Sequence, residues 1–219
     1  MGYAGSALDN AYGSKIITPQ FLNVGSEEIT LNDLRPVSSA ASMDWMIELQ
    51  RVDNGGETIE SEDYMWVGGQ WCDVFGTPIT KTVTFAPGES VVAYSYLGDT
   101  AANLQSSGEV NEKKVVVALD TAWGSVISGN PYPVEIELNQ LIPLDDKDVA
   151  IGDWMIEIQK VDNGGETIEA EDYMWVGNQW CDVYGSPIKE KITFDPGEGF
   201  VVYSYTGSAA YLHIVAPEL

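Results

Sequence analysis

The residues with the richest candidate chemistry form an aromatic segment, YMWVGGQWCD at positions 64–73, which recurs as YMWVGNQWCD at positions 173–182. Aromatic rings beside an amide and a carboxylate could stack on a sugar ring and hydrogen-bond its hydroxyls. The leading interpretation for Trp66 and Trp71 is nevertheless that they belong to a hydrophobic core. The candidate glycan-binding residues are Tyr64, Trp66, Trp71, Asp73, Tyr173, Trp175, Trp180 and Asp182.

Two acidic groups could supply oxygen ligands for Ca²⁺, which is a hard cation. The first is Asp53, Glu57, Glu60, Glu62 and Asp63, and the second is Asp145, Asp146 and Asp148. Their spacing matches no EF-hand loop, and hairpin tips are commonly acidic because they face solvent. Ca²⁺ is therefore the one cofactor that we keep as a hypothesis, and we expect no other.

The residue types needed for catalysis are sparse. His213 is the only histidine and has no counterpart in the first copy of the repeat described below, so two equivalent sites cannot share histidine acid–base chemistry. The sequence contains no nucleophile elbow, phosphate-binding loop or zinc motif. A pair of carboxylates for glycoside cleavage stays open, because sequence does not show which carboxylates approach each other. We expect a protein that is not an enzyme.

A tandem duplication positions these residues. Residues 44–96 and 153–205 align without a gap, and roughly three quarters of the paired positions are identical. Weaker similarity extends the repeat over nearly all 219 residues. We predict two domains, 1–104 and 105–219, and a linker within residues 97–114, which are rich in Gly, Ala, Ser and Asn.

Within each copy the hydrophobic residues alternate with polar ones, which is typical of β-strands. Trp45, Ile47 and Leu49 are predicted to face inward. Asn54-Gly55 and Asn163-Gly164 supply hairpin turns, and Pro87-Gly88-Glu89 and its twin Pro196-Gly197-Glu198 are turn signals. About seven short strands in each copy, with no helical periodicity, predict an all-β chain of two tandem homologous β-sandwich domains that resemble jelly rolls.

Two irregularities lead to further predictions. The inward parity suggested by Ile59 conflicts with that of Tyr64 and Trp66, which predicts a bulge within residues 60–63. Residues 1–6 are poor in β-formers where the second copy has a good strand ending at Val117. The first domain would then lack its first strand, and its open sheet edge would dock onto a neighbouring subunit. The alternative is that residues 1–6 pair in the sheet despite their weak β-propensity, or stay loose as a terminus.

Charge and hydropathy exclude several classes of partner. A net charge of −24 with ten Lys and Arg residues repels phosphate backbones and anionic lipid surfaces. We therefore expect no nucleic-acid binding and a partner that is neutral or basic. No apolar run is long enough to span a membrane, and residues 1–6 lack the basic start and apolar stretch of a signal peptide.

The two cysteines, Cys72 and Cys181, occupy equivalent positions, one in each copy. Neither predicted domain therefore contains a pair for an internal disulfide or enough thiols for a metal cluster. We expect both to be buried as small hydrophobic residues.

Two turn motifs suggest a relationship. The second copy carries GNPYP at 129–133 and PGEGFVV at 196–202, whereas the first has Thr18-Pro19-Gln20-Phe21 in place of the first motif. With these motifs the second copy resembles β-sandwich modules of bacterial surface proteins and of proteins from bacteria and their phages. The resemblance implies a structural or adhesive role and transfers no functional residues.

The sequence thus predicts a structural or assembly protein, such as a head decoration or tail component of a virion or a component of a cell-surface layer. Its partners would be other protein subunits of the assembly, and duplication would double the contacts at high effective concentration. The alternative is a carbohydrate-binding module that uses the Trp-rich segments. Either function places the protein on a virion or an extracellular surface.

Overall fold

The computed structural model describes residues 2–8, 14–23, 25, 28–53, 60–119, 124–162 and 169–217. Over these ranges the chain is all-β, as predicted, with two 3₁₀ turns as its helical elements. The N-terminal half contains β1 (Gly2–Ala7), β2 (Ser14–Ile17), β3 (Phe21–Leu22), β4 (Ile29–Thr30), η1 (Leu31–Asp33), β5 (Arg35–Ser38), β6 (Ile47–Asp53), β7 (Glu60–Val67), β8 (Gln70–Cys72), β9 (Thr84–Phe85), β10 (Val91–Ser95) and β11 (Ala102–Val110).

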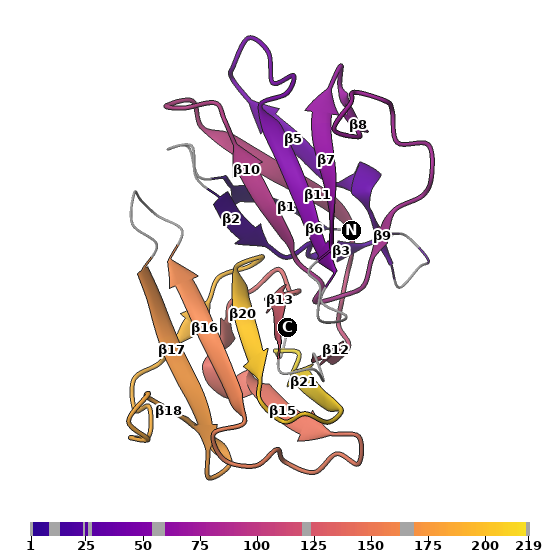
Figure 1. The fold of residues 1–219 in the computed structure, drawn as a ribbon. Coiled ribbons are helices and arrows are strands. Elements are labelled where there is room, and N and C mark those ends of the chain that lie inside the picture. Colours follow the sequence, from indigo (N-terminus) through magenta and orange to yellow (C-terminus); the bar gives the residue numbers. More distant parts are fainter. Residues whose placement is uncertain are drawn as a thin grey trace.

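The C-terminal half repeats this order of elements, except that β3 has no counterpart among its described strands (Figure 1). It contains β12 (Val115–Ala118), β13 (Ser125–Gly129), β14 (Ile136–Glu137), η2 (Leu138–Gln140), β15 (Leu141–Asp145), β16 (Ile156–Asp162), β17 (Glu169–Val176), β18 (Gln179–Cys181), β19 (Thr193–Phe194), β20 (Gly199–Ser204) and β21 (Ala210–Ile214). The two turns predicted to follow β6 and β16, Asn54-Gly55 and Asn163-Gly164, lie outside the described residues. The strands on either side of each turn pair as an antiparallel hairpin.

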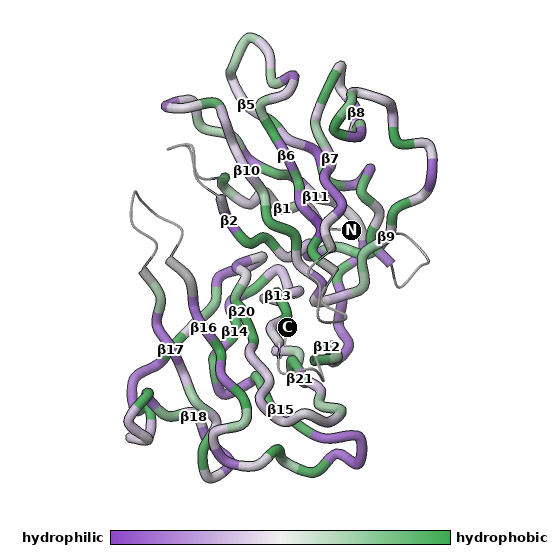
Figure 2. Tube along the Cα trace, in the orientation of Figure 1, coloured by the Kyte–Doolittle hydropathy of each residue, from purple (hydrophilic) through white to green (hydrophobic). Residues whose placement is uncertain are grey.

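Each half has two main antiparallel sheets that face each other across a hydrophobic core. In the N-terminal half, β2-β10-β6-β7-β8 opposes a sheet in which β11 pairs with β1, β3 and β5. In the C-terminal half, β13-β20-β16-β17-β18 opposes β12-β21-β15. Residues of both sheets meet in one buried cluster per half, and hydrophobic and hydrophilic stretches alternate along the strands in both halves (Figure 2). This is a sandwich-like arrangement.

The alternation predicted along β6 holds from its first residue but fails before it. Ile47 and Leu49 are fully buried, whereas Trp45 is 45% exposed, as is its twin Trp154 at 43%. Both tryptophans have a φ of 65°, which lies outside the β region, so the chain leaves the strand pattern at this residue. The inward prediction for Trp45 is therefore wrong.

The first strand of the N-terminal half is present, which corrects another prediction. β1 pairs with β11 at six positions, from Gly2 opposite Gly108 to Ala7 opposite Asn103. The weak β-propensity of Gly, Ala and Ser is overridden by this pairing in the folded chain. Docking through a missing edge strand therefore loses its basis.

The predicted linker is also wrong, because β11 occupies Ala102–Val110 and is the central strand of its sheet. The boundary expected between residues 104 and 105 lies inside this strand. The residues that separate the last strand of the N-terminal half from the first strand of the C-terminal half are 111–114.

The predicted bulge at residues 60–63 is absent. The pairing of β6 with β7 runs without a break from Asp53 opposite Glu60 to Glu48 opposite Met65. Glu62 shares the inward face with Tyr64 but lies beyond the edge of the core, where it accepts hydrogen bonds from Tyr64 Oη and Lys81 Nζ. A carboxylate can therefore occupy the inward row without a change of register.

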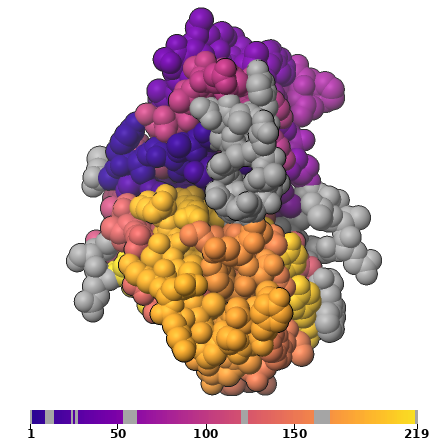
Figure 3. All heavy atoms as spheres, turned by 90° about the vertical axis from the view of Figure 1, so that its left-hand side faces the viewer, coloured from indigo at the N-terminus to yellow at the C-terminus, as the bar shows by residue number. Residues whose placement is uncertain are grey.

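The two halves meet across an approximate two-fold axis, with the N-terminal half stacked on the C-terminal half in Figures 1 and 3. Ile17 of β2 bridges Glu198, and the equivalent Ser128 of β13 bridges Glu89. Hydrogen bonds join Thr18 N to Gly197 O at 3.0 Å and Ser128 Oγ to Gly88 O at 2.9 Å. Each half thus presents its Pro-Gly-Glu turn to the other, as the two subunits of an isologous dimer do.

Candidate functional site

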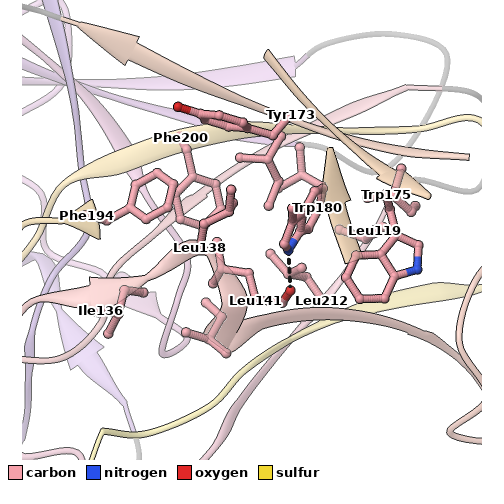
Figure 4. Close-up of a cluster of buried hydrophobic side chains, with 14 of the residues drawn as sticks. Leu119, Ile136, Leu138, Leu141, Tyr173, Trp175, Trp180, Phe194, Phe200 and Leu212 are labelled. Atoms are coloured by element: carbon pink, nitrogen blue, oxygen red, sulfur yellow. Dashed lines mark hydrogen bonds between the residues drawn. The ribbon is translucent and has the colours of Figure 1, made fainter. Parts of the chain in front are cut away.

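The aromatic residues predicted to bind glycans lie mostly in the interior, as Figure 4 shows for the C-terminal half. Trp71 Nε1 donates to Leu34 O, and Trp180 Nε1 donates to Leu141 O, both at 2.8 Å. The core interpretation is confirmed for Trp71, and Trp66 is partly buried against the same cluster. Five of the eight candidates are buried and offer no open face for stacking: Tyr64, Trp71, Tyr173, Trp175 and Trp180.

The two candidate aspartates hold a tight turn after β8 and β18. Asp73 Oδ1 accepts the backbone N–H groups of Phe75 and Thr77 at 2.9 and 2.8 Å. These backbone hydrogen bonds favour the ionised carboxylate and lower the pKa of Asp73. Asp182 makes the same two contacts with Tyr184 and Ser186. Both carboxylates therefore shape a loop, and they present its next residues to solvent.

The residues that follow the two aspartates are exposed and apolar. Together with the exposed apolar residues named below, they form in each half a surface that we call the aromatic loop. Phe75 is 87% exposed and its twin Tyr184 is 89% exposed, although a large apolar side chain is normally withdrawn from water. Trp45, Met46 and Val74 extend the surface in the N-terminal half. The equivalent loop in the C-terminal half consists of Trp154, Met155, Val183 and Tyr184.

Backbone contacts hold each aromatic loop in a fixed conformation. Trp45 N donates to Trp66 O at 2.9 Å, and Asp44 Oδ1 accepts from Gly68 N at 2.8 Å. The Trp45 ring lies directly over Gly76, where a Cβ atom would fall 2.9 Å from Trp45 Cη2. Gly76 itself has a φ of 82°. The loop therefore requires glycine at position 76. Packing on this glycine fixes the orientation of the Trp45 ring.

The left-handed conformation of Trp45 and Trp154 is strained for a bulky residue. Such a conformation costs roughly 1–2 kcal/mol for an L-amino acid, and strain of this kind is concentrated at sites of function. Both copies retain it at an exposed tryptophan, with the same φ. The sequence signal that we missed is Asp-Val-aromatic-Gly at 73–76 and 182–185, which places two apolar residues at the tip of a turn.

Tyrosines and carboxylates occupy the outer sheet face next to the aromatic loop. Tyr96 N donates to Met46 O, and Tyr96 Oη donates to Glu48 Oε2 at 2.8 Å. Desolvation and the Glu48 carboxylate raise the pKa of Tyr96 to about 12, so its hydroxyl remains protonated at neutral pH. The equivalent Tyr205 contacts Glu157 in the same way. This face presents negative charge beside the apolar surface.

A pocket of about 610 Å³ lies in the C-terminal half beside β18. We call it the β18 pocket. Its lining includes Leu138, Trp175, Trp180 and Ile188, with Asn178 and Gln179 among the polar residues. The pocket thus brings together two of the predicted site residues, Trp175 and Trp180, while Asp182 is not in its lining.

Trp175 carries an unsatisfied donor at this pocket. The side chain is 6% exposed, and its Nε1–H has no hydrogen-bond partner among the described residues. Leaving a buried donor unpaired costs about 1–3 kcal/mol. Native proteins rarely keep such a group without a reason.

The histidine and the two cysteines, which were considered for catalysis and metal binding, are buried in the fold. Burial and nearby Lys114 lower the pKa of His213, and burial raises the pKa of the Cys72 and Cys181 thiols. Both cysteines are buried, as predicted, and free. In the described part of the chain, no three His, Cys, Asp or Glu side chains are arranged to hold a metal ion.

The second acidic group contains a turn of its own. Asp145 Oδ1 accepts from Lys147 N and Val149 N, each at 2.8 Å, and these bonds lower the pKa of Asp145. In the first group, Glu57 lies outside the described residues. No helix in the described ranges is long and apolar enough to cross a membrane.

Neither protein-family models nor curated protein sequences match this chain.

Proposed function

We propose that this protein is a structural or assembly component that binds a neutral or basic protein subunit through its two aromatic loops. The observation that carries the proposal is that the same rigid, exposed apolar surface is built twice, around Phe75 and around Tyr184. Exposed apolar surfaces of this kind mark interaction sites. Aromatic residues are also the commonest hot spots of protein interfaces.

The rigidity of the loops supports a binding role, because a fixed loop loses little conformational entropy when a partner docks. The net charge of the chain indicates what kind of partner would bind. The chain carries −24 and places Glu48 and Glu157 near the loops, so a second copy of the chain would be repelled. A neutral or basic subunit would be attracted.

The position of the loops supports a linking role. β8 and β18, which lead into the two loops, lie at opposite ends of the molecule (Figure 1). Two equal sites at opposite ends let one chain bridge two copies of the same partner, which increases avidity in a repeating array. A virion surface and a cell-surface layer are both arrays of this kind.

Site-specific photocrosslinking tests the proposal. A benzoylphenylalanine residue replaces Phe75, Tyr184 or, as a control, Val116, which is exposed on β12 away from both loops. In the particles or cells that carry the protein, positions 75 and 184 should capture the same protein and position 116 should not. Capture of different proteins at the two loops, of the chain itself, or equal capture at Val116 would contradict the proposal.

A further inference from the structure

The two copies of the repeat differ most where the β18 pocket lies. Nine residues of the duplicated block line the pocket, and five of them differ from the first copy. Of the other forty-four paired positions, nine differ. The five are Asn178, Lys189, Glu190, Lys191 and Ile192, where the first copy has Gly69, Thr80, Lys81, Thr82 and Val83.

A difference outside the aligned residues 44–96 and 153–205 also changes the wall of the pocket. The pocket wall includes Ile142 of β15, where the first copy has the exposed Arg35. The C-terminal half therefore has an apolar wall at a position where the N-terminal half has a cation. Divergence concentrated at one cavity, within copies that are otherwise close to identical, indicates a role that the two halves do not share.

The chemistry of the lining combines an apolar floor with a polar rim. Leu138 and Trp175 are buried and Ile188 is half-buried, and we call these three residues the floor. Asn178 and Gln179 are exposed, and with the charged residues of the lining they form what we call the rim. Sites with a few placed polar groups above an apolar surface are typical of small-ligand binding. A sugar ring matches this arrangement, because it has C–H faces and hydroxyls that both donate and accept.

The charges around the pocket balance. The lining contains two carboxylates, Glu137 and Glu190, and two ammonium groups, Lys189 and Lys191. Lys191 Nζ lies 3.5 Å from Glu137 Oε1, and 2.7 Å from Oε1 of Glu135, which is outside the lining. The lining residues thus carry no net charge, and the field of the whole chain repels anions. A neutral ligand fits better than an acidic one.

We propose that the β18 pocket is a binding site for a neutral saccharide and that the N-terminal half does not share it. The amides at the rim hydrogen-bond the hydroxyls, and a C–H face of the sugar rests on the apolar floor. No residue of the aromatic loops lines the pocket, so either function can fail without the other.

The test replaces four lining residues of the pocket with the residues at the equivalent positions of the first copy. The variant Asn178→Gly, Lys189→Thr, Glu190→Lys, Lys191→Thr carries only residues that the same fold accommodates in its first half. Asn178 has a φ of 58°, which glycine tolerates, and the new lysine can pair with Glu171 as Lys81 pairs with Glu62. The reciprocal variant of the N-terminal half, Gly69→Asn, Thr80→Lys, Lys81→Glu, Thr82→Lys, is the matched control.

The probes are neutral malto-, cello-, xylo- and chito-oligosaccharides of two to six units, with sialylated and sulfated glycans beside them on an array. We expect a neutral oligosaccharide to bind. In calorimetry its affinity should fall about tenfold or more in the pocket variant and remain unchanged in the control. Binding by no neutral glycan, binding by acidic glycans alone, or an unchanged affinity in the pocket variant would overturn the proposal.

Discussion

The N-terminal and C-terminal halves agree in some surfaces and differ in others. Both place an aromatic residue, Phe75 or Tyr184, at the tip of a loop held by an aspartate. Both also place a Pro-Gly-Glu turn against the partner half. They differ at the β18 pocket, where the C-terminal half has its own rim. The retained surfaces support the proposed linking of two equal partners, and the divergent surface supports the proposed saccharide site of the C-terminal half.

The contact between the halves has the form expected of two identical subunits. Gly197 packs against Ser6, Thr18 and Gln20 of the N-terminal half, and Gly88 packs against Val115 and Val117 of the C-terminal half. Ser6 and Val117 are equivalent positions in β1 and β12. Fusion of two copies that formed an isologous dimer would produce this symmetry.

The largest effect expected is in the cores, where both halves use the same tryptophan. Trp71→Ala and Trp180→Ala should each lower the free energy of unfolding by about 3–5 kcal/mol, because each removes a buried ring and leaves a carbonyl without its donor. Phe75→Ser, at an exposed ring, should change it by less than about 0.5 kcal/mol. Urea denaturation followed by circular dichroism measures all three. A large loss in Phe75→Ser would show that the aromatic loop belongs to the core.

The next largest effect is expected from substitutions at the contact between the two halves. A Cβ atom at Gly197 would lie 2.5 Å from Gln20 Nε2 and 2.8 Å from Ser6 Oγ, at a residue whose φ is 74°. Gly197→Ala should cost about 2 kcal/mol through strain and crowding. Gly88→Ala, the symmetric change at a φ of 84°, should cost a similar amount. Thermal denaturation compares the two, and a loss confined to one of them would contradict the two-fold contact.

A smaller effect is expected at the strained tryptophans. Trp45→Asn replaces a residue in the left-handed region with one that tolerates it. Trp45 is 45% exposed, so the packing of its ring on Gly76 is lost when the strain is relieved. The two contributions oppose each other, and the free energy of unfolding should change by less than about 1 kcal/mol. Trp154→Asn should do the same. A loss of more than about 2 kcal/mol in both variants would mean that the tryptophans serve the fold rather than a partner.

The smallest effect concerns pH and is expected in the C-terminal half alone. His213 is buried with its Nδ1 3.1 Å from Lys114 Nζ, and its pKa is lowered in the folded protein. The unfolded chain therefore binds the proton more readily, so stability falls as the pH decreases below about 6.5 towards the lower folded-state pKa. His213→Gln should remove this part of the pH dependence. Urea denaturation at pH values from 8 to 5 tests this prediction. The same dependence of the free energy of unfolding on pH in the unmodified protein and in His213→Gln would contradict it.

The sequence predicted the regular part of the fold. The period-two pattern at Ile47 and Leu49 identified β6, and the Pro-Gly-Glu turns closed as hydrogen-bonded turns, with Glu89 N donating to Ala86 O. The pattern failed where pairing overrides propensity. β1 and β11 consist largely of Gly, Ala, Ser and Asn, and their pairing within the sheet makes them strands.

The candidate site was predicted less well, because exposure and backbone conformation are set by the folded chain. Trp45 continues the alternation in sequence, but its positive φ turns it to the surface. Phe75 was overlooked because a single aromatic residue in a turn has no periodicity. The β18 pocket depends on the approach of η2 to β18, which are about forty residues apart in sequence and therefore show no local signal.

The central claim is that the two aromatic loops are equal and independent sites, and the most direct test counts partner molecules per chain. Native mass spectrometry of the purified chain with the protein captured at position 75 should give two partners per chain. Phe75→Ser or Tyr184→Ser alone should leave one, and the double variant should leave none. A single partner on the unmodified chain, or two partners on the double variant, would contradict the account.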